Sequence, residues 1–263
     1  MNDFVLTVIY ILTGVVGLCV GSFLNVVIYR VPEGMSLAKP DSHCPKCKYK
    51  LKWYDNIPIL SYIILGGKCR GCGERISFRY TAVEIANTLL WLLSAFLFVK
   101  ESIVFAVMAA LASSIFIIVF FIDLEHMLVF NRFVLALALL GFGTMFSDPF
   151  TKWYDHLIGL VVALFLFGGV FVYYILRYTK EAMGGGDIKL AMAAGFFLGW
   201  QRFILAIIIA SLSASIVLLI VRKKNKHKKD REYPFAPFLV SGFAVAMFVG
   251  DIVIPWYMSL LLG

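Results

Sequence analysis

Charged residues are scarce in this sequence. Of its 263 residues only 15% are charged, whereas 61% are hydrophobic and the mean hydropathy is +0.89. In a typical soluble domain about a quarter of all residues are charged, so this composition excludes a soluble globular enzyme. The alternating ten-residue segments of an outer-membrane barrel are absent as well. The composition therefore predicts an all-α polytopic membrane protein.

The N-terminal segment lacks the basic residues that begin a cleavable signal peptide. The first Lys or Arg is Arg30, and the apolar run 4–28 is long enough to cross a bilayer, so we predict it as the first transmembrane helix. Further apolar runs cover 82–99, 102–122, 129–147, 156–176, 188–200, 203–221 and 234–262. The runs 188–200 and 203–221 are separated because one straight helix over both would be too long for a single span. About eight transmembrane helices are predicted.

Basic residues are rare in the predicted spans and unequally divided between the loops. With the N-terminus outside, the inside segments hold 21 of the 24 Lys and Arg, and the outside turns hold only Lys100, Lys152 and Arg202. The positive-inside rule then places the loop 30–80 in the cytosol. The net charge of +8 follows from this topology, and nucleic acid is not an expected partner. We divide the chain into a first helix (1–29), a cytosolic domain (30–80) and a membrane-embedded domain (81–263).

Cysteine is also rare, but four of the five cysteines form two C-x-x-C pairs in the predicted cytosolic loop. The pairs are Cys44 with Cys47 and Cys69 with Cys72, and 21 residues separate them. Each pair directs two thiolates at one point, and two pairs complete a tetrahedral Zn²⁺ shell. Disulfides or redox thiols are the alternative, but a cytosolic location disfavours lasting disulfides. We therefore predict a structural zinc site, because four thiolates leave no open coordination position.

Acidic residues are few enough to be considered singly at the ends of the predicted spans. Asp123 ends one span, and Asp187 follows three glycines at the start of another. Alone, Asp123 is equally well an interfacial residue, and Asp187 an N-cap. Together, two carboxyl groups that share a proton provide general acid–base catalysis of peptide hydrolysis. Glu84 stands at the start of the second span, where it is either a helix-dipole partner or a contact for a basic peptide.

Six stretches of the chain resemble, in the same order, the type IV prepilin peptidases, which are bifunctional leader peptidases and N-methyltransferases among the G-x-G-D intramembrane aspartyl proteases. The resemblance covers nearly the whole chain. The stretches are "GSFLNVVIYRVP", "DNIPILSYIILGGKC", "RYTAVE", "FIDLEHMLVFNR", "MGGGDIKLAMAAGFFLGW" and "PFAPFL".

The resemblance implies an activity and a location. Members of the family cleave the basic leader of prepilins or pseudopilins at the cytosolic face of the bacterial inner membrane. Many then methylate the new N-terminal residue with S-adenosylmethionine. The family's catalytic pair corresponds to Asp123 and Asp187, and the tetracysteine loop is typical of bifunctional members. We assign the loop around Asp187 to substrate, with Gly184, Gly185 and Gly186 leaving room for its backbone and Lys189 beside them.

The chain also departs from the family pattern. Val129-Phe130 stands where an Ile-Pro pair is common, "RYT" replaces "RYP", and Ala236 stands where glycine is usual. None of these changes affects the aspartates or the cysteines. The sequence contains no recognisable S-adenosylmethionine motif, so it does not predict where the methyl donor binds. It does not predict the oligomeric state either.

Two other functions compete with the peptidase. A secondary transporter would use Asp123 and Asp187 as a proton relay, but transporter sites lie at the bilayer midplane, often between repeats, and no repeat is visible. Alternatively, the tetracysteine loop is a docking module of a pilus or secretion assembly. That alternative predicts assembly defects after cysteine substitutions, and no proteolysis.

Overall fold

The computed structural model describes residues 2–39, 41–178, 184–224 and 233–262. Among these residues every regular element is a helix, and the only β pairing consists of two isolated bridges. The chain divides into two compact units, Met1–Lys100 and Glu101–Gly263. The boundaries predicted from sequence separate polar from apolar segments, whereas these two units are defined by packing. Most of the basic loop that begins at Arg222 lies outside the described residues.

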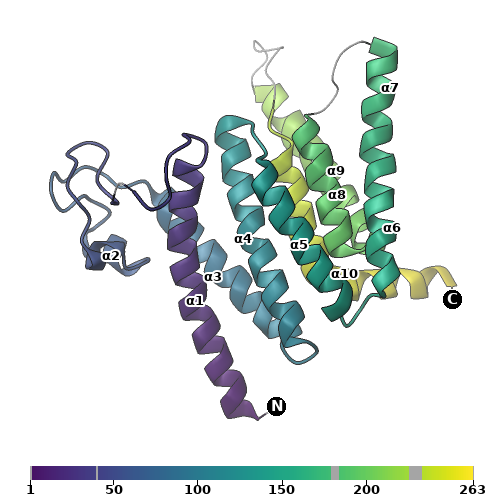
Figure 1. Cartoon of the computed structure of the whole chain (residues 1–263), viewed down its shortest axis with the longest axis horizontal. Coiled ribbons are helices and arrows are strands. Elements are labelled where there is room, and N and C mark those ends of the chain that lie inside the picture. Colours follow the sequence, from purple (N-terminus) through teal and green to yellow (C-terminus); the bar gives the residue numbers. More distant parts are fainter. Residues whose placement is uncertain (1, 40, 179–183, 225–232, 263) are drawn as a thin grey trace. The chain divides into compact units, whose positions relative to one another are not determined.

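The first unit contains two long helices and the polar loop between them. Helices α1 (Asp3–Arg30) and α3 (Phe78–Phe98) pack against one another (Figure 1). The loop carries two short elements, η1 (Trp53–Asn56) and α2 (Leu60–Ile64). Gly17 and Gly21 of α1 allow the close approach, because a Cβ at Gly21 would lie 2.9 Å from the Cα of Glu84. Small residues at helix contacts are typical of packing within a membrane.

The second unit is a bundle in which one short helix occupies the centre. Helix α8 packs against four other helices, α5, α6, α9 and α10 (Figure 1). Gly195 of α8 lies in direct backbone contact with Gly159 of α6. The elements of the unit are α4 (Ile103–His126), α5 (Asn131–Ser147), α6 (Trp153–Ala163), the π-helical segment η2 (Leu164–Gly168), α7 (Gly169–Tyr178), α8 (Gly185–Leu198), α9 (Trp200–Lys224) and α10 (Ala236–Leu262).

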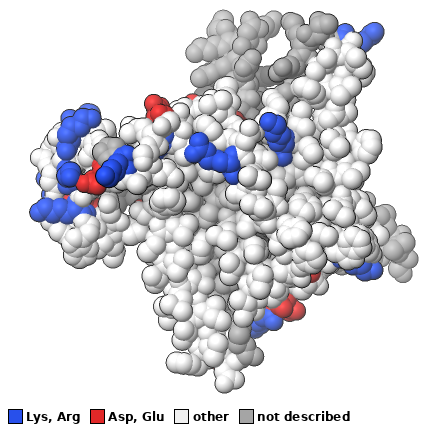
Figure 2. Space-filling model, viewed as in Figure 1, with Lys and Arg blue, Asp and Glu red and all other residues white. Residues whose placement is uncertain are grey.

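The helices have the surface of a membrane protein. Six of the described helical segments are long and apolar enough to cross a bilayer: Asp3–Arg30, Phe78–Phe98, Ile103–His126, Trp153–Arg177, Trp200–Val221 and Ala236–Leu260. Large apolar side chains such as Phe96, Phe165 and Leu176 are exposed on them. Lys and Arg instead gather over the loop of the first unit (Figure 2). The class predicted from composition, an all-helical multi-pass membrane protein, is confirmed.

The count of eight crossings stays a prediction. Helices α5 and α8 coincide with predicted spans but have only 17 and 14 residues. At 1.5 Å per residue, α8 extends about 21 Å, which is less than the roughly 30 Å hydrocarbon core. Its burial among other helices explains how so short an apolar helix is accommodated.

A buried charged cluster joins three segments of the second unit. The Arg202 side chain is 1% exposed, and its guanidinium donates to the carboxylates of Asp148 and Asp251. The rings of Phe105 and Phe150 lie 5.6 and 5.7 Å from the guanidinium carbon. The charge count placed Arg202 in a turn on the outer side of the membrane, whereas the structure places it in the first turn of α9. Its burial between two carboxylates makes it part of the core instead.

Candidate active site and metal centre

Asp123 lies in the last turn of α4, just before the chain reverses. Met127, the first residue after α4, has a left-handed conformation (φ 54°), which ends the helix. The Asp123 side chain is 5% exposed, and its Oδ2 accepts a hydrogen bond of 3.1 Å from the backbone N–H of Ala236. The Asp123 carboxylate is therefore buried and bound at the end of α4, and its position at the membrane interface stays a prediction.

The start of α10 provides the partner of Asp123. Ala236 is the first residue of this helix, and its N–H is one of the groups that a helix leaves without an internal partner. The positive end of the helix dipole favours a negative charge at this position. The stretch "PFAPFL" was recognised in the sequence, but its contact with Asp123 was not. Pro237 just inside the helix was the available signal, since proline is common in a first turn.

Asp187 lies in the first turn of α8 and is partly buried. Gly184 occupies the N-cap position, so the interpretation of Asp187 as the N-cap is wrong. A Cβ at Gly186 would lie 2.9 Å from the Cβ of Val129, so the start of α8, which carries Asp187, lies beside the chain that follows Asp123 and α4. The second unit thus brings together two carboxyl groups that are 64 residues apart in the chain. Two interacting carboxyl groups bind one proton more readily than separate ones do.

The three glycines before Asp187 are not equivalent. A Cβ at Gly186 would lie 2.9 Å from the Cβ of Val129, so this glycine packs against the chain that follows α4. A Cβ at Gly185 would meet no atom within 4 Å. A Cβ at Gly184 would be 3.8 Å from Oδ2 of Asp187. Gly186 thus serves packing, and only Gly184 and Gly185 border open space.

Lys189 connects α8 to α5. Its Nζ donates a 3.2 Å hydrogen bond to Oδ1 of Asn131, and the side chain is exposed. The contact fixes the start of α8 beside the start of α5. A role of Lys189 toward substrate stays a prediction.

The four predicted metal ligands converge in the first unit. Their sulfur atoms lie within 4.8 Å of one another, and the pairs Cys44–Cys72 and Cys47–Cys69 are both 3.9 Å apart. All four are free thiols, so the disulfide alternative is wrong for this structure. Zn–S bonds of about 2.3 Å in a tetrahedron separate the sulfur atoms by about 3.8 Å. The donor set therefore fits one zinc ion.

The two C-x-x-C turns have the same backbone. In the first, the N–H of Lys48 donates to the carbonyl of Cys44, and in the second the N–H of Gly73 donates to that of Cys69. Lys48 (φ 59°) and Gly73 (φ 71°) have matching left-handed conformations. In the sequence, glycines stand only beside the second pair. A lysine in the same conformation shows that the constraint comes from the turn.

Asp55 links the two turns and was missed by the sequence analysis. Its carboxylate accepts hydrogen bonds from the Tyr49 hydroxyl and the Lys52 N–H, and from Nε of Arg70 at 2.8 Å. Burial alone would raise the pKa of Asp55, but these hydrogen bonds, above all that of Arg70, hold it below its ordinary value. Asp55 thus ties Tyr49, two residues after Cys47, to Arg70, the residue after Cys69.

We expect the purified chain to contain one zinc per molecule. Replacing Cys47 by Ser removes one of four ligands, so the metal should be lost and the loop should become sensitive to protease. Replacing Cys19, which lies in α1 away from the cluster, by Ser is the matched control and should leave the zinc content unchanged. Elemental analysis measures both. Freshly purified protein with no zinc would contradict the site.

Family models match both units. The model described as Bacterial Peptidase A24 N-terminal domain matches residues 15–98, and that of the Type IV leader peptidase family matches 110–219. A protein of Legionella pneumophila named "Prepilin leader peptidase/N-methyltransferase" is 34% identical over 276 residues, which is 95% of this chain and 94% of the relative.

The chain belongs to the type IV leader peptidase family.

Other relatives of the same name confirm the extent of the similarity. A Bacillus subtilis protein is 32% identical over 94% of this chain and 97% of its own length. A Pseudomonas aeruginosa protein is 32% identical over 94% of this chain and 92% of its own. No solved structure matches the chain significantly. The leader peptidase match contains both Asp123 and Asp187, whereas the N-terminal match contains the four cysteines. The resemblance recognised in the sequence is thus confirmed.

Proposed function

We propose that this protein cleaves the basic leader peptide from type IV prepilins or pseudopilins and then N-methylates the new terminal residue. The single observation that carries the proposal is the packing of the start of α8, which carries Asp187, against the chain just after α4, where the Asp123 carboxylate is buried. The family membership and the names of the relatives support the same conclusion. Prepilins are the substrates that those names imply.

The paired carboxyl groups account for peptide hydrolysis without a covalent intermediate. One carboxylate takes a proton from water, whose oxygen attacks the scissile carbonyl carbon. The other carboxyl group, protonated at that moment, donates to the carbonyl oxygen and stabilises the tetrahedral species. The proton then passes to the leaving amine as the C–N bond breaks. The N–H of Ala236 holds Asp123 in place for this cycle.

We place the N-terminus outside and both aspartates at the cytosolic face of the bacterial inner membrane. The 21-to-3 division of Lys and Arg supports this orientation. Asp123 near the end of α4 and Asp187 near the start of α8 then lie at cytosolic ends of their helices. A leader cut on this side is followed by the hydrophobic helix of the pilin, which stays in the bilayer.

Zinc in the tetracysteine site has a structural role in this proposal. Four thiolates occupy all positions of a tetrahedral ion, so the metal stabilises the two turns and offers no site for a substrate. The site stands in the unit that matches the N-terminal family model. S-adenosylmethionine is the proposed methyl donor, as the N-methyltransferase name of the relatives indicates.

Two of the glycines beside Asp187 can be used to distinguish two roles, which are leaving space for the substrate backbone and allowing close packing inside the protein. Gly186→Ala should destabilise the protein by about 1–3 kcal/mol, because its Cβ meets Val129. Gly185→Ala should leave stability unchanged or slightly raised, since Ala favours the helix. If Gly185 leaves room for substrate, Gly185→Ala lowers the cleavage rate of a prepilin while thermal denaturation is unaffected. Full cleavage by Gly185→Ala would contradict that role.

The proposed function is tested with purified protein, a prepilin and labelled S-adenosylmethionine. We expect a shortened pilin that carries the label at its N-terminus. Cleavage without label would overturn the methyltransferase half alone. Transport activity or pilus assembly defects without any cleavage would overturn the peptidase.

A further inference from the structure

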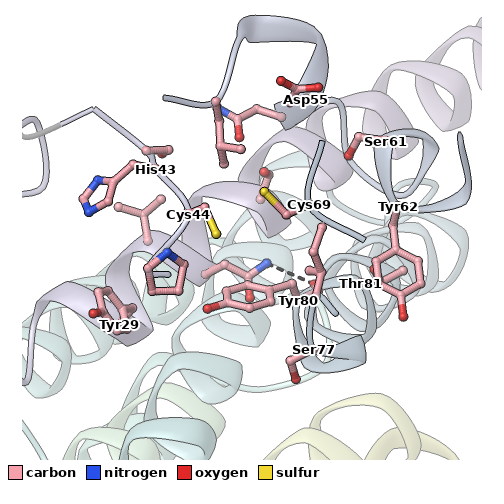
Figure 3. Close-up of a pocket in the computed structure, with 18 of the residues that line it drawn as sticks. Tyr29, His43, Cys44, Asp55, Ser61, Tyr62, Cys69, Ser77, Tyr80 and Thr81 are labelled. Atoms are coloured by element: carbon pink, nitrogen blue, oxygen red, sulfur yellow. Dashed lines mark hydrogen bonds between the residues drawn. The ribbon is translucent and has the colours of Figure 1, made fainter. Parts of the chain in front are cut away.

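The short helix α2 of the cysteine loop has its polar side inward and its apolar side outward. Ser61 and Tyr62 line a pocket of about 750 Å³ between α2, α1 and the cysteine turns (Figure 3). The outward side chains are large and apolar, since Leu60 is 56% exposed, Ile63 66% and Ile64 76%. An element that faces water has the opposite arrangement. The outward side of α2 therefore suits an apolar environment.

The exposed apolar surface continues into the chain before α2. Trp53 of η1 is 79% exposed, and η1 contacts α2. Between Lys52 and Lys68 the only charged residue is Asp55, whose side chain is buried. We call residues 53–64 the apolar segment. Its exposed large apolar side chains are those of Trp53, Ile57, Leu60, Ile63 and Ile64. A surface of this kind marks a place where another apolar body is in contact with the protein.

The contacts of α2 place it beside the apolar part of α1 and not beyond its end. The backbone N–H of Ile59, just before α2, donates a 2.9 Å hydrogen bond to Oε2 of Glu84 in α3. Glu84 in turn packs against Gly21, because a Cβ there would lie 2.9 Å from the Cα of Glu84. From Gly21 to Arg30, where α1 ends, the helix rises about 14 Å. Figure 1 accordingly shows α2 alongside the C-terminal half of α1, and this part belongs to the apolar run 4–28.

Basic side chains surround the apolar segment. The loop from Arg30 to Arg79 has ten Lys and Arg against four Asp and Glu, and the exposed Lys52 and Lys68 flank the segment itself. Such side chains lay their stems along apolar groups and extend their charge to the headgroups, and basic clusters are attracted to anionic lipids. Tryptophan, here Trp53, is enriched where the bilayer meets water. The pattern complements the surface of an anionic bilayer.

We propose that the apolar segment docks into the bilayer surface, with its outward side chains among the acyl chains and with Lys52 and Lys68 at anionic headgroups. The partner is lipid because the segment lies beside a helix that itself crosses the bilayer. Docking holds the cysteine turns at the membrane surface, since Asp55 of the segment accepts a hydrogen bond from Arg70 within the second turn. In the proposed orientation this is the cytosolic leaflet, so part of the loop lies in the membrane.

Fluorescence quenching at single labelled cysteines tests the docking, with the full-length, zinc-loaded protein in vesicles of phosphatidylcholine and phosphatidylglycerol. Ile64→Cys carries the label on the apolar segment, and Lys39→Cys, exposed in the same loop just after α1, is the matched control. Both variants also carry Cys19→Ser, and zinc protects the four cysteines of the turns from the label. An interfacial apolar face lies roughly 5–10 Å into the acyl boundary, so a nitroxide on the upper acyl chain should quench residue 64 at least about threefold more than residue 39. Iodide in the water should show the reverse order.

The outcomes decide between lipid and other occupants of this surface. Leu60→Cys is a second labelled position on the outward side of α2 and should respond as Ile64→Cys does. Zinc content, measured by elemental analysis, confirms that each variant is folded. Iodide quenching at residues 60 and 64 as strong as at residue 39 would overturn the docking. Protection from both quenchers would indicate a protein contact, and loss of acyl-chain quenching on addition of a prepilin would indicate the substrate helix. Either result would overturn lipid as the partner, and none of these results depends on the catalytic aspartates.

Discussion

Replacing Asp123 by Asn is expected to reduce leader cleavage at least about a hundredfold, and to about ten-thousandfold if the acid–base role is fully lost. Asn has the shape of Asp, and its amide oxygen still accepts the N–H of Ala236. It cannot take a proton from water, however. Asp187→Asn should have the same effect, because the mechanism needs both carboxyl groups.

The double variant sharpens this prediction. If Asp123 and Asp187 act as one unit, the double variant loses no more activity than either single variant. If they act independently, the fold losses of the two single variants multiply in the double variant. Glu125→Gln is the matched control, since Glu125 is exposed on the same helix turn, and it should cleave normally. Rates are measured on a purified prepilin, with thermal denaturation to confirm folding. Full activity in either single Asn variant would contradict the paired mechanism.

Replacing Arg202 by Met is expected to destabilise the protein by about 3–5 kcal/mol. The substitution leaves the buried Asp148 side chain and the partly buried Asp251 without the guanidinium, although the methionine fills most of the space between the two phenylalanine rings. For a chain of this size the loss corresponds to a fall of roughly 6–20 °C in Tm. Cleavage by the remaining folded protein should be unaffected.

Two further variants control for this effect. Lys152→Met removes an exposed positive charge and should shift Tm by no more than about 2 °C. Arg202→Met combined with Asp148→Asn and Asp251→Asn removes the unpaired charges, so it should regain part of the lost stability. A Tm in Arg202→Met equal to that of the unaltered protein would show that the cluster contributes nothing.

The helices were predictable because a bilayer imposes strong rules on sequence. Each of the eight apolar runs coincides with a helical segment, including the short α8 that follows the three glycines. A break was predicted between the runs 188–200 and 203–221, and the structure has it at Gly199, whose φ of 78° separates α8 from α9. The four metal ligands were also predictable, because the C-x-x-C spacing within each turn determines where the two thiolates point.

The contacts across the site were less predictable, because they depend on packing between distant segments. Nothing in the local pattern shows that Ala236 donates to Asp123 or that Gly186 meets Val129. Charge counting assigned Arg202 to an outer turn, but a sequence does not show that its side chain is buried between two distant carboxylates. Asn25 was not singled out in the sequence, because its hydrogen bond to the carbonyl of Tyr80 joins two helices that are distant in the chain.

Mass spectrometry of a prepilin co-expressed with this protein tests the central claim most directly. We predict that the pilin loses its leader and gains the mass of one methyl group at the new N-terminus, and that co-expression with the Asp123→Asn variant leaves it at full length. A prepilin that stays at full length beside the folded, unaltered protein would contradict the account.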